Sequence, residues 1–253
     1  MTTPWPPKPD IVGPAPGIAI TGATLTYDGA AVFAGVDLTL EAGRLSALLG
    51  PSGVGKTSLL RAIAGLETLE AGTVRASDGA PLAGRVAWMA QRDLLLPWAD
   101  ALSNVTLGAR LRGEKPDAGR AEGLLARVGL AGKRRALPGT LSGGERQRVA
   151  LARTLYEDKP VVLMDEPFSA LDAITRARLQ ELAAEMLAGR TVLLITHDPW
   201  EACRIGEAVY VLSGRPATLG APLVLDGAIP RAPDDEAALR AQGRLLARLE
   251  VGA

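Results

Sequence analysis

The stretch LSALLGPSGVGKTS, from Leu45 to Ser58, decides the fold of this chain. Its first five residues are apolar or small, which is typical of a strand buried on both faces. A glycine-rich turn follows, and a helix is expected to begin near Lys56. A strand, a glycine loop and a helix in this order open a parallel α/β unit. The stretch therefore predicts an α/β protein.

The turn inside this stretch has the spacing G-x-x-x-x-G-K-[ST]. Glycines let backbone N–H groups approach an anionic oxygen closely, and a helix N-terminus adds partial positive charge. The Lys56 ammonium can reach the β- and γ-phosphates of a nucleotide, and the Thr57 hydroxyl can bind Mg²⁺. A chance glycine-rich turn is the alternative, which the preceding strand disfavours. The residues expected to bind nucleotide are Gly50, Pro51, Ser52, Gly53, Val54, Gly55, Lys56, Thr57 and Ser58.

A second buried strand ends in two acids, in the run VVLMDEP from Val161 to Pro167. Open α/β sheets bind ligands at the carboxyl ends of their strands, so both side chains are expected beside the phosphates. Asp165 is the expected Mg²⁺ partner, through water, and Glu166 is the expected general base. The alternative is an exposed acidic strand end or a helix N-cap.

The remaining pattern predicts one domain over residues 17–253, preceded by a flexible, proline-rich lead-in at 1–16. The order is β-rich segments, an α/β unit, a helical insertion at about 92–158, and α/β units again. The other expected elements are β-type runs over 17–42, helices at 120–128, 146–156 and 173–187, strands at 161–164 and 191–196, and a polar helix near 234–249.

Composition narrows the class of protein. Lys plus Arg and Asp plus Glu both number 28, so the net charge is zero, which argues against a nucleic-acid partner. The single cysteine, Cys203, is expected to be a small buried residue. No apolar run approaches the ~20 residues of a membrane helix, and the N-terminus lacks the features of a secretory signal. Cytoplasm is therefore the expected location.

The run LSGGERQR, from Leu141 to Arg148, leads into a helix. Ser142, Gly143 and Gly144 form a second potential anion site at a helix N-terminus. One nucleotide needs only one such site, so the second is expected to serve the ATP of another molecule. An ordinary Gly-Gly helix start is the alternative. With these motifs, the chain resembles the ATP-binding subunits of ABC transporters, and LSGGERQR resembles their signature motif.

Four further positions match the family pattern, which spans roughly Ile18 to Gly214. Tyr27 stands where the family stacks a ring on adenine, although a lone strand tyrosine is more often a packing residue. Gln91 matches the glutamine that senses Mg²⁺ and the attacking water. Asp172 ends SALD, the loop that links the two sites, and His197, the one histidine of the chain, matches the residue that contacts the γ-phosphate. The family's acidic-basic pair near Gly206 and Glu207 is missing.

The resemblance implies a P-loop NTPase with a RecA-like parallel core, an antiparallel β subdomain and an inserted helical subdomain. It implies ATP and Mg²⁺ as ligands, with Thr57, Gln91 and Asp165 at the metal and Glu166, His197 and Gln91 in catalysis. It further implies a second ATP-binding subunit, most simply an identical copy, a transmembrane permease, and indirectly a solute-binding protein. Such a subunit is peripheral on the cytoplasmic face of the cell membrane. A heterodimer with a sister ATPase stays open.

The segment Gln91 to Asn104 is expected to contact the permease, because Leu94, Leu95, Leu96 and Trp98 offer an apolar face. Packing within the helical insertion is the alternative. Residues 88–114 resemble ATPases that serve uptake of thiamine precursors such as hydroxymethylpyrimidine, and also those of taurine, sulfonate and nitrate importers.

Two other classes of protein, soluble ABC ATPases and P-loop kinases or GTPases, agree less well with this sequence. Chromosome-type ABC ATPases insert a long coiled coil, but Gln91 and Leu141 are only 50 positions apart. Ribosome-type members carry two sets of motifs in one chain, and this chain has one. A P-loop kinase or GTPase would have no use for LSGGERQR.

Overall fold

A computed structural model of the protein describes residues 14–251. The expected flexible lead-in therefore lies largely outside the described residues. Ala15 and Pro16, at its end, are buried, and the Pro16 carbonyl accepts a hydrogen bond from Thr191 Oγ1 at 2.7 Å. The packed part of the domain thus begins slightly before residue 17.

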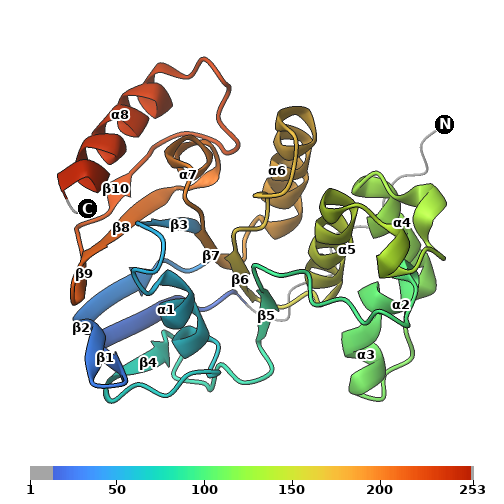
Figure 1. Ribbon diagram of the computed structural model, residues 1–253, viewed down its shortest axis with the longest axis horizontal. Coiled ribbons are helices and arrows are strands. Elements are labelled where there is room, and N and C mark those ends of the chain that lie inside the picture. Colours follow the sequence, from blue (N-terminus) through green and yellow to red (C-terminus); the bar gives the residue numbers. More distant parts are fainter. Residues whose placement is uncertain (1–13, 252–253) are drawn as a thin grey trace.

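Five parallel strands lie side by side at one end of a mixed sheet (Figure 1). Three of them are buried along their whole length, as expected for strands covered on both faces. Their carboxyl ends lie at one edge of the sheet, where the candidate site forms. In spatial order the strands are β8 (Ala208–Gly214), β3 (Leu45–Leu49), β7 (Thr191–Ile195), β6 (Val161–Asp165) and β5 (Val86–Met89).

Antiparallel strands extend the sheet beyond β8. Alternate residues of the first strand, among them Ile18 and Ile20, are buried, which is the pattern of a strand with one face on the core. These strands are β1 (Ile18–Tyr27), β2 (Ala30–Leu40), β4 (Ala71–Ala76), β9 (Ala217–Leu219) and β10 (Leu223–Val224). Strand β2 also pairs with β9 in parallel, which joins the two parts into one sheet.

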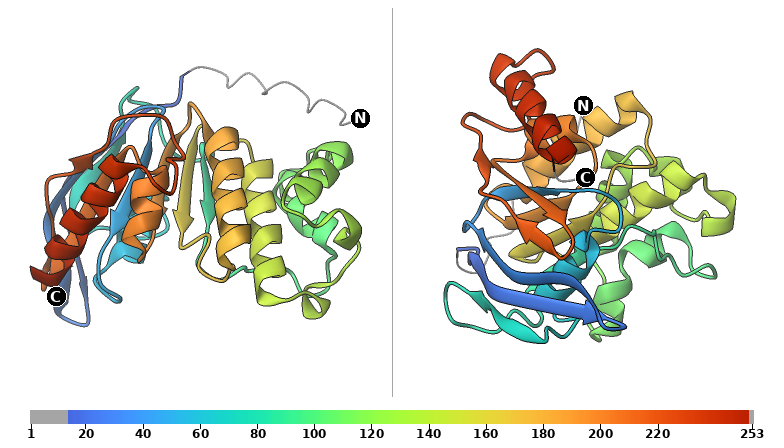
Figure 2. Two further views of the ribbon diagram at one scale, coloured as in Figure 1. Left: turned by 90° about the horizontal axis from the view of Figure 1, so that it is seen from above. Right: turned by 60° about the vertical axis from the view of Figure 1, so that its left-hand side comes forward.

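Helices connect the parallel strands and form an insertion between β5 and β6. Figure 2 shows this insertion at the opposite end of the molecule from α8. The connecting helices are α1 (Lys56–Ile63), α6 (Ala173–Leu187) and α7 (Pro199–Ile205), and α8 (Glu236–Val251) follows the last strand. The insertion contains α2 (Ala101–Val105), α3 (Leu107–Leu111), α4 (Ala118–Arg127), α5 (Gly143–Tyr156) and the short 3₁₀ turns Ala131–Lys133 and Pro138–Thr140.

Helix α5 joins the insertion to the sheet. Leu124 of α4, Val149 of α5 and Met164 of β6 belong to one continuous cluster of buried apolar residues. Because this cluster crosses the boundary between the insertion and the sheet, a displacement of α5 also disturbs the packing on the sheet.

The C-terminal helix α8 is not polar all round, contrary to expectation. Ala238, Ala241 and Leu245 are buried against α7 and β8, at the spacing of one helical face. Cys203 belongs to the same cluster, and burial raises the pKa of its thiol to about 11. The cysteine is therefore a neutral core residue, as expected.

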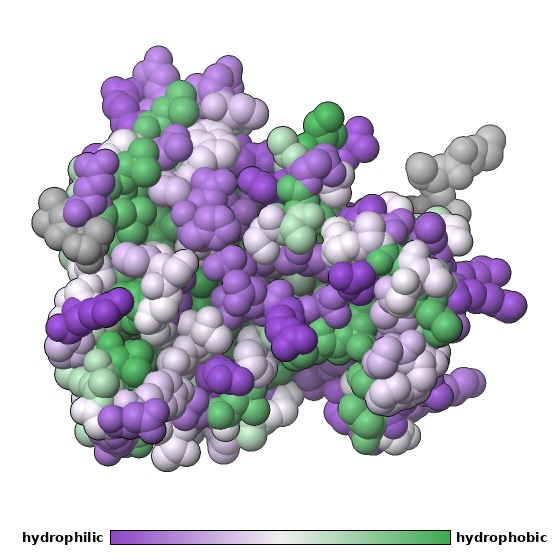
Figure 3. All heavy atoms as spheres, in the orientation of Figure 1, coloured by the Kyte–Doolittle hydropathy of each residue, from purple (hydrophilic) through white to green (hydrophobic). Residues whose placement is uncertain are grey.

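On the face shown in Figure 3, hydrophobic side chains form small patches between hydrophilic ones. Within residues 14–251, no helix combines the length and the apolar character that crossing a membrane requires.

Candidate functional site

A cavity of about 330 Å³ opens where β3 and β6 end. It brings together residues from five separate parts of the sequence. Ten of these residues are predicted site residues. These are Tyr27, Ser52, Gly53, Gly55, Lys56, Thr57, Ser58, Gln91, Asp165 and Glu166, and Val32 completes the lining. The remaining predicted loop residues, Gly50, Pro51 and Val54, belong to the same turn but do not line the cavity.

The turn between β3 and α1 requires glycine at Gly55. Its φ of +106° lies in the left-handed region, and a Cβ there would lie 2.6 Å from Val32 Cγ1 and 3.3 Å from Phe33. Strand β2 therefore packs directly against the turn. This close approach holds the loop open as a cradle of backbone N–H groups at the start of α1.

The Lys56 ammonium lies inside the cradle. Its Nζ donates to the carbonyl oxygens of Gly50 at 2.8 Å and Pro51 at 2.9 Å. Burial lowers the pKa of Lys56, and the nearby charges of Glu166 and Asp165 act in the opposite direction. An ammonium has three donors, so one remains for an anion in the cavity.

Thr57 and Asp165 face each other across the cavity floor. Thr57 Oγ1 donates to Asp165 Oδ2 at 2.7 Å. Burial raises the pKa of Asp165, while the Thr57 hydroxyl and the Lys56 charge lower it. A hydroxyl beside a carboxylate suits Mg²⁺, which prefers oxygen ligands. Among the described residues no group of three His, Cys, Asp or Glu side chains could hold a metal, so further ligands would come from Gln91, which lines the same cavity, and from phosphate or water.

Glu166 has a strained backbone directly after β6. Its φ is +48°, a conformation that costs a non-glycine residue roughly 1–3 kcal/mol. Its N–H donates to the Ile195 carbonyl at 2.9 Å, which fixes it next to the end of β7. His197 follows β7, and its Nδ1 lies 3.2 Å from Glu166 Oε2. The structure therefore brings the expected base and the expected histidine together.

Tyr27 lies at the rim of the cavity, at the end of β1. Its hydroxyl donates to Glu67 Oε2 at 2.6 Å, and this hydrogen bond raises the pKa of Tyr27. The sequence contained no signal for Glu67, because the two residues are far apart in the chain. The contact holds the exposed ring beside the cavity.

The signature residues lie outside this cavity. Ser142 is the N-cap of α5: its Oγ accepts from the Glu145 N–H at 3.2 Å, and its own N–H donates to Glu145 Oε2 at 2.8 Å. Gly143 lines a separate hollow that also borders Gln91. Asp172 caps α6 by accepting from the Thr175 N–H at 3.0 Å. Within one subunit, Ser142, Gly143, Gly144 and Asp172 thus do not meet the nucleotide loop.

Glu207, at the position of the missing acidic-basic pair, makes polar contacts with the start of β3. Glu207 Oε2 accepts from the Leu45 N–H at 2.9 Å, and its other oxygen lies 3.9 Å from Arg44. The carboxylate therefore supports the start of β3.

The apolar segment after Gln91 divides into exposed and buried residues. Leu94 is 57% exposed and Trp98 is 76% exposed, whereas Leu95 is buried and Leu96 is half-buried. Leu94 has a φ of +46°, so the chain turns sharply between neighbouring leucines. Half of the expected face therefore packs within the insertion, as the alternative interpretation proposed.

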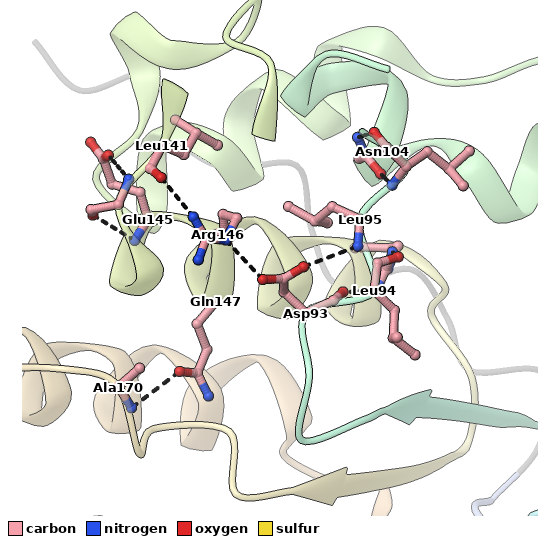
Figure 4. A network of polar contacts seen from close by, with 12 residues as sticks. Asp93, Leu94, Leu95, Asn104, Leu141, Glu145, Arg146, Gln147 and Ala170 are labelled. Carbon is pink, nitrogen blue, oxygen red and sulfur yellow. Dashed lines mark hydrogen bonds and ion pairs between the residues drawn. The ribbon is translucent and has the colours of Figure 1, made fainter. Parts of the chain in front are cut away.

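Polar contacts from α5 and α2 hold this segment in place (Figure 4). Arg146 Nε pairs with Asp93 Oδ2 at 3.0 Å, and Arg153 donates to the Asp93 and Leu94 carbonyls at 2.6 and 2.9 Å. Asn104, which is fully buried, accepts from the Leu96 N–H at 2.8 Å. The sequence did not single out these three holding side chains.

The fold and cavity define a P-loop nucleotide-binding protein, which confirms the expected α/β class. Residues 33–169 match the family described as ABC transporter, so the chain belongs to that family and carries its ATP-binding, ATP-hydrolysing domain.

Named relatives and a solved structure agree with this assignment. The chain is 47% identical over 80% of its length to the aliphatic sulfonates import ATP-binding protein SsuB 1 of Rhodococcus jostii, covering 81% of it. It is 41% identical to the SsuB of Delftia acidovorans over 97% of this chain and 98% of that one. The dimeric post-hydrolysis structure of the cassette MJ0796, bound to ADP and Pi, matches with a TM-score of 0.75 and 27% identity, over 83% of this chain and 99% of that one.

Proposed function

We propose that this protein is the ATPase subunit of an importer for a small sulfonate. The two relatives described above are named for import of aliphatic sulfonates, and the chain spans most of their length. This favours the sulfonate interpretation over a thiamine precursor such as hydroxymethylpyrimidine. The subunit works at the cytoplasmic face of the membrane, as a peripheral partner of a permease to which a solute-binding protein delivers the solute.

The observation that carries the proposed function is a cavity lined by predicted nucleotide-loop, metal and base residues but by none of the signature residues. Lys56, Thr57, Asp165 and Glu166 share its lining, while Ser142 to Gly144 lie outside it. We infer that the Ser142 turn of a second subunit closes the cavity over ATP. The dimeric MJ0796 structure supports this arrangement by similarity of fold.

The residues of the cavity, together with His197 beside Glu166, divide the work of hydrolysis. Lys56 and the N–H groups of the loop bind the β- and γ-phosphates, and Tyr27 stacks on the adenine. Glu166 Oε2 accepts the proton of the attacking water, and His197 and Gln91 orient the water and the γ-phosphate. Thr57 and Asp165 would hold Mg²⁺, which supplies charge stabilisation when bound.

The exposed side chains Leu94 and Trp98 are the proposed contact with the permease. Both project from the segment that begins at Gln91, at the edge of the cavity. A large exposed aromatic side chain and an exposed leucine on one segment are typical of the apolar centre of a protein interface. The solute itself would bind to the permease and the binding protein, so the cavity makes no contact with it.

The test uses the purified subunit and its Glu166→Gln variant. The wild type should hydrolyse ATP, and the variant should lose about 10²–10⁴-fold in kcat, the range for a general base. With ATP bound, the variant should form a stable dimer in light scattering, whereas nucleotide-free protein should stay monomeric. A variant that hydrolyses ATP at the wild-type rate, or stays monomeric with saturating ATP, contradicts the assignment.

The solute is tested by uptake of labelled ethanesulfonate into cells that carry the complete transporter. Uptake should disappear when the ATPase carries Glu166→Gln. Hydroxymethylpyrimidine uptake is measured in the same cells. Uptake of that compound alone would overturn the sulfonate proposal while leaving the ATPase assignment intact.

A further inference from the structure

Gln147 of α5 bridges the two ends of the loop that follows β6. Its Nε2 donates to the Glu166 carbonyl at 2.9 Å, and its Oε1 accepts from the Ala170 N–H at 3.1 Å. Figure 4 shows the Gln147 side chain reaching from α5 toward Ala170. Gln147 is only 6% exposed, and both hydrogen bonds are partly buried.

The loop from Glu166 to Ala170 needs such support because its backbone is strained at Glu166. Its centre is anchored by Phe168, which is fully buried, and Ser169 Oγ donates to the same Glu166 carbonyl at 3.0 Å. Gln147 alone among these contacts comes from the helix that begins with the signature turn. A strained conformation persists only where its surroundings fix it, so the loss of Gln147 should free the loop.

The backbone of α5 also approaches this loop closely. A Cβ on Gly144 would lie 3.1 Å from the Ala170 carbonyl oxygen and 3.5 Å from Leu171. The second glycine of the signature therefore has a packing role within its own subunit. Together, Gly144 and Gln147 fix the start of α5 against the loop.

We propose that Gln147 is a positioning residue for hydrolysis: it holds the Glu166 backbone and ties it to the Ser142 turn. This inference rests on the proposed function. The Ser142 turn serves the nucleotide of the neighbouring subunit, whereas Glu166 serves the nucleotide of its own. Gln147 thus makes the Ser142 turn and Glu166 move together. The position of the base in one nucleotide site therefore depends on how the Ser142 turn contacts the nucleotide of the other site.

The first test compares Gln147→Leu with wild type. Leucine has a similar volume and removes both hydrogen bonds, so Glu166 should lose its position. We expect kcat to fall at least about tenfold, since small misplacements of catalytic groups are costly, while KM for ATP stays within about twofold. Thr154→Val is the matched control: Thr154 is buried on the same helix, and its hydroxyl donates to the Ala150 carbonyl at 3.0 Å. Its kcat should stay within about twofold of wild type.

Gln147→Glu gives a second test that survives poor folding of the leucine variant. Glutamate still accepts from the Ala170 N–H, but it donates to the Glu166 carbonyl only when protonated. Burial raises the pKa of a carboxyl group above its usual value near 4. The ratio of variant to wild-type kcat should therefore rise as the pH falls from about 8 to about 6.

The results separate this inference from the proposed function. An inactive wild-type protein would refute the proposed function. An active wild type with a leucine variant of equal kcat, or a glutamate variant whose kcat ratio is independent of pH, would refute only the role of Gln147. Equal loss of kcat in Gln147→Leu and Thr154→Val would assign the effect to helix stability and would also refute that role.

Discussion

Glu201 carries a buried carboxyl group in the helix that follows His197. It is only 4% exposed, and burial raises its pKa to about 7. Hydrogen bonds from the Thr196 hydroxyl and from Gln180 lower the pKa, whereas the negative charge of Asp198 raises it. Burial dominates, so the folded protein favours the neutral acid. We predict that this group makes the stability of the protein depend on pH.

The sign and magnitude follow from the two pKa values of Glu201. In the unfolded chain the carboxyl has its ordinary pKa of 4.5, and in the folded chain the pKa is about 7. Between these values the folded state binds the proton that the unfolded state has lost, so the free energy of unfolding falls as the pH rises. One pKa unit corresponds to about 1.4 kcal/mol, so the full shift corresponds to about 3 kcal/mol, reached above pH 7.

The Glu201→Gln substitution removes this dependence, because the amide stays neutral at every pH and can still accept from Gln180. Urea unfolding at about pH 8 should show the variant more stable than wild type by as much as about 3 kcal/mol, with a difference below about 1 kcal/mol at pH 5.

Glu185→Gln is the control for Glu201→Gln, since Glu185 is an exposed carboxylate that pairs with Arg127 on the surface. It should change stability by less than about 1 kcal/mol at both pH values. A Glu201→Gln variant whose stability differs from wild type equally at both pH values would refute the reasoning.

Two further variants test the cavity and the proposed permease contact. Lys56→Ala removes the cation that the loop carbonyls hold, so the Kd for a fluorescent ATP analogue should rise at least about tenfold; an unchanged titration would contradict the role of Lys56. Leu94→Ser with Trp98→Ser removes the exposed apolar pair and should abolish co-purification with the permease, while ATP turnover of the isolated subunit stays within about twofold. Intact co-purification would place the contact elsewhere.

The parts of the fold set by neighbours in the chain were predictable from the sequence. The apolar strand Leu45–Leu49 and the helix Ala173–Leu187 lie at their predicted positions. Their signals are apolar runs, periodicity and N-caps, which a short window of sequence contains. The glycine spacing of the nucleotide loop is equally local, and the cavity contains most of its predicted residues.

Features that depend on distant contacts were not predictable. Glu67 meets Tyr27 across 40 positions, and Gln147 meets Glu166 across 19. A sequence also cannot show which leucine of a run points inward, and the positive φ of Leu94 decides this after the turn. The buried face of α8 gives a weak signal in the sequence because it includes small alanines among many charged residues.

Helix α5 links the segment of the proposed permease contact to the loop of the proposed base Glu166 within one subunit. Arg146 pairs with Asp93, next to the exposed Leu94, and the adjacent residue Gln147 holds Glu166. Arg146 also donates to the Leu141 carbonyl at 2.8 Å, at the start of the signature turn. Neighbouring residues of one rigid helix hold the Asp93 segment and the Glu166 loop. A shift of Asp93 by a docked permease must therefore either break the Arg146–Asp93 ion pair or move the helix. The pair is partly exposed and weak, so the packed core around α5 determines how much of that shift reaches Glu166.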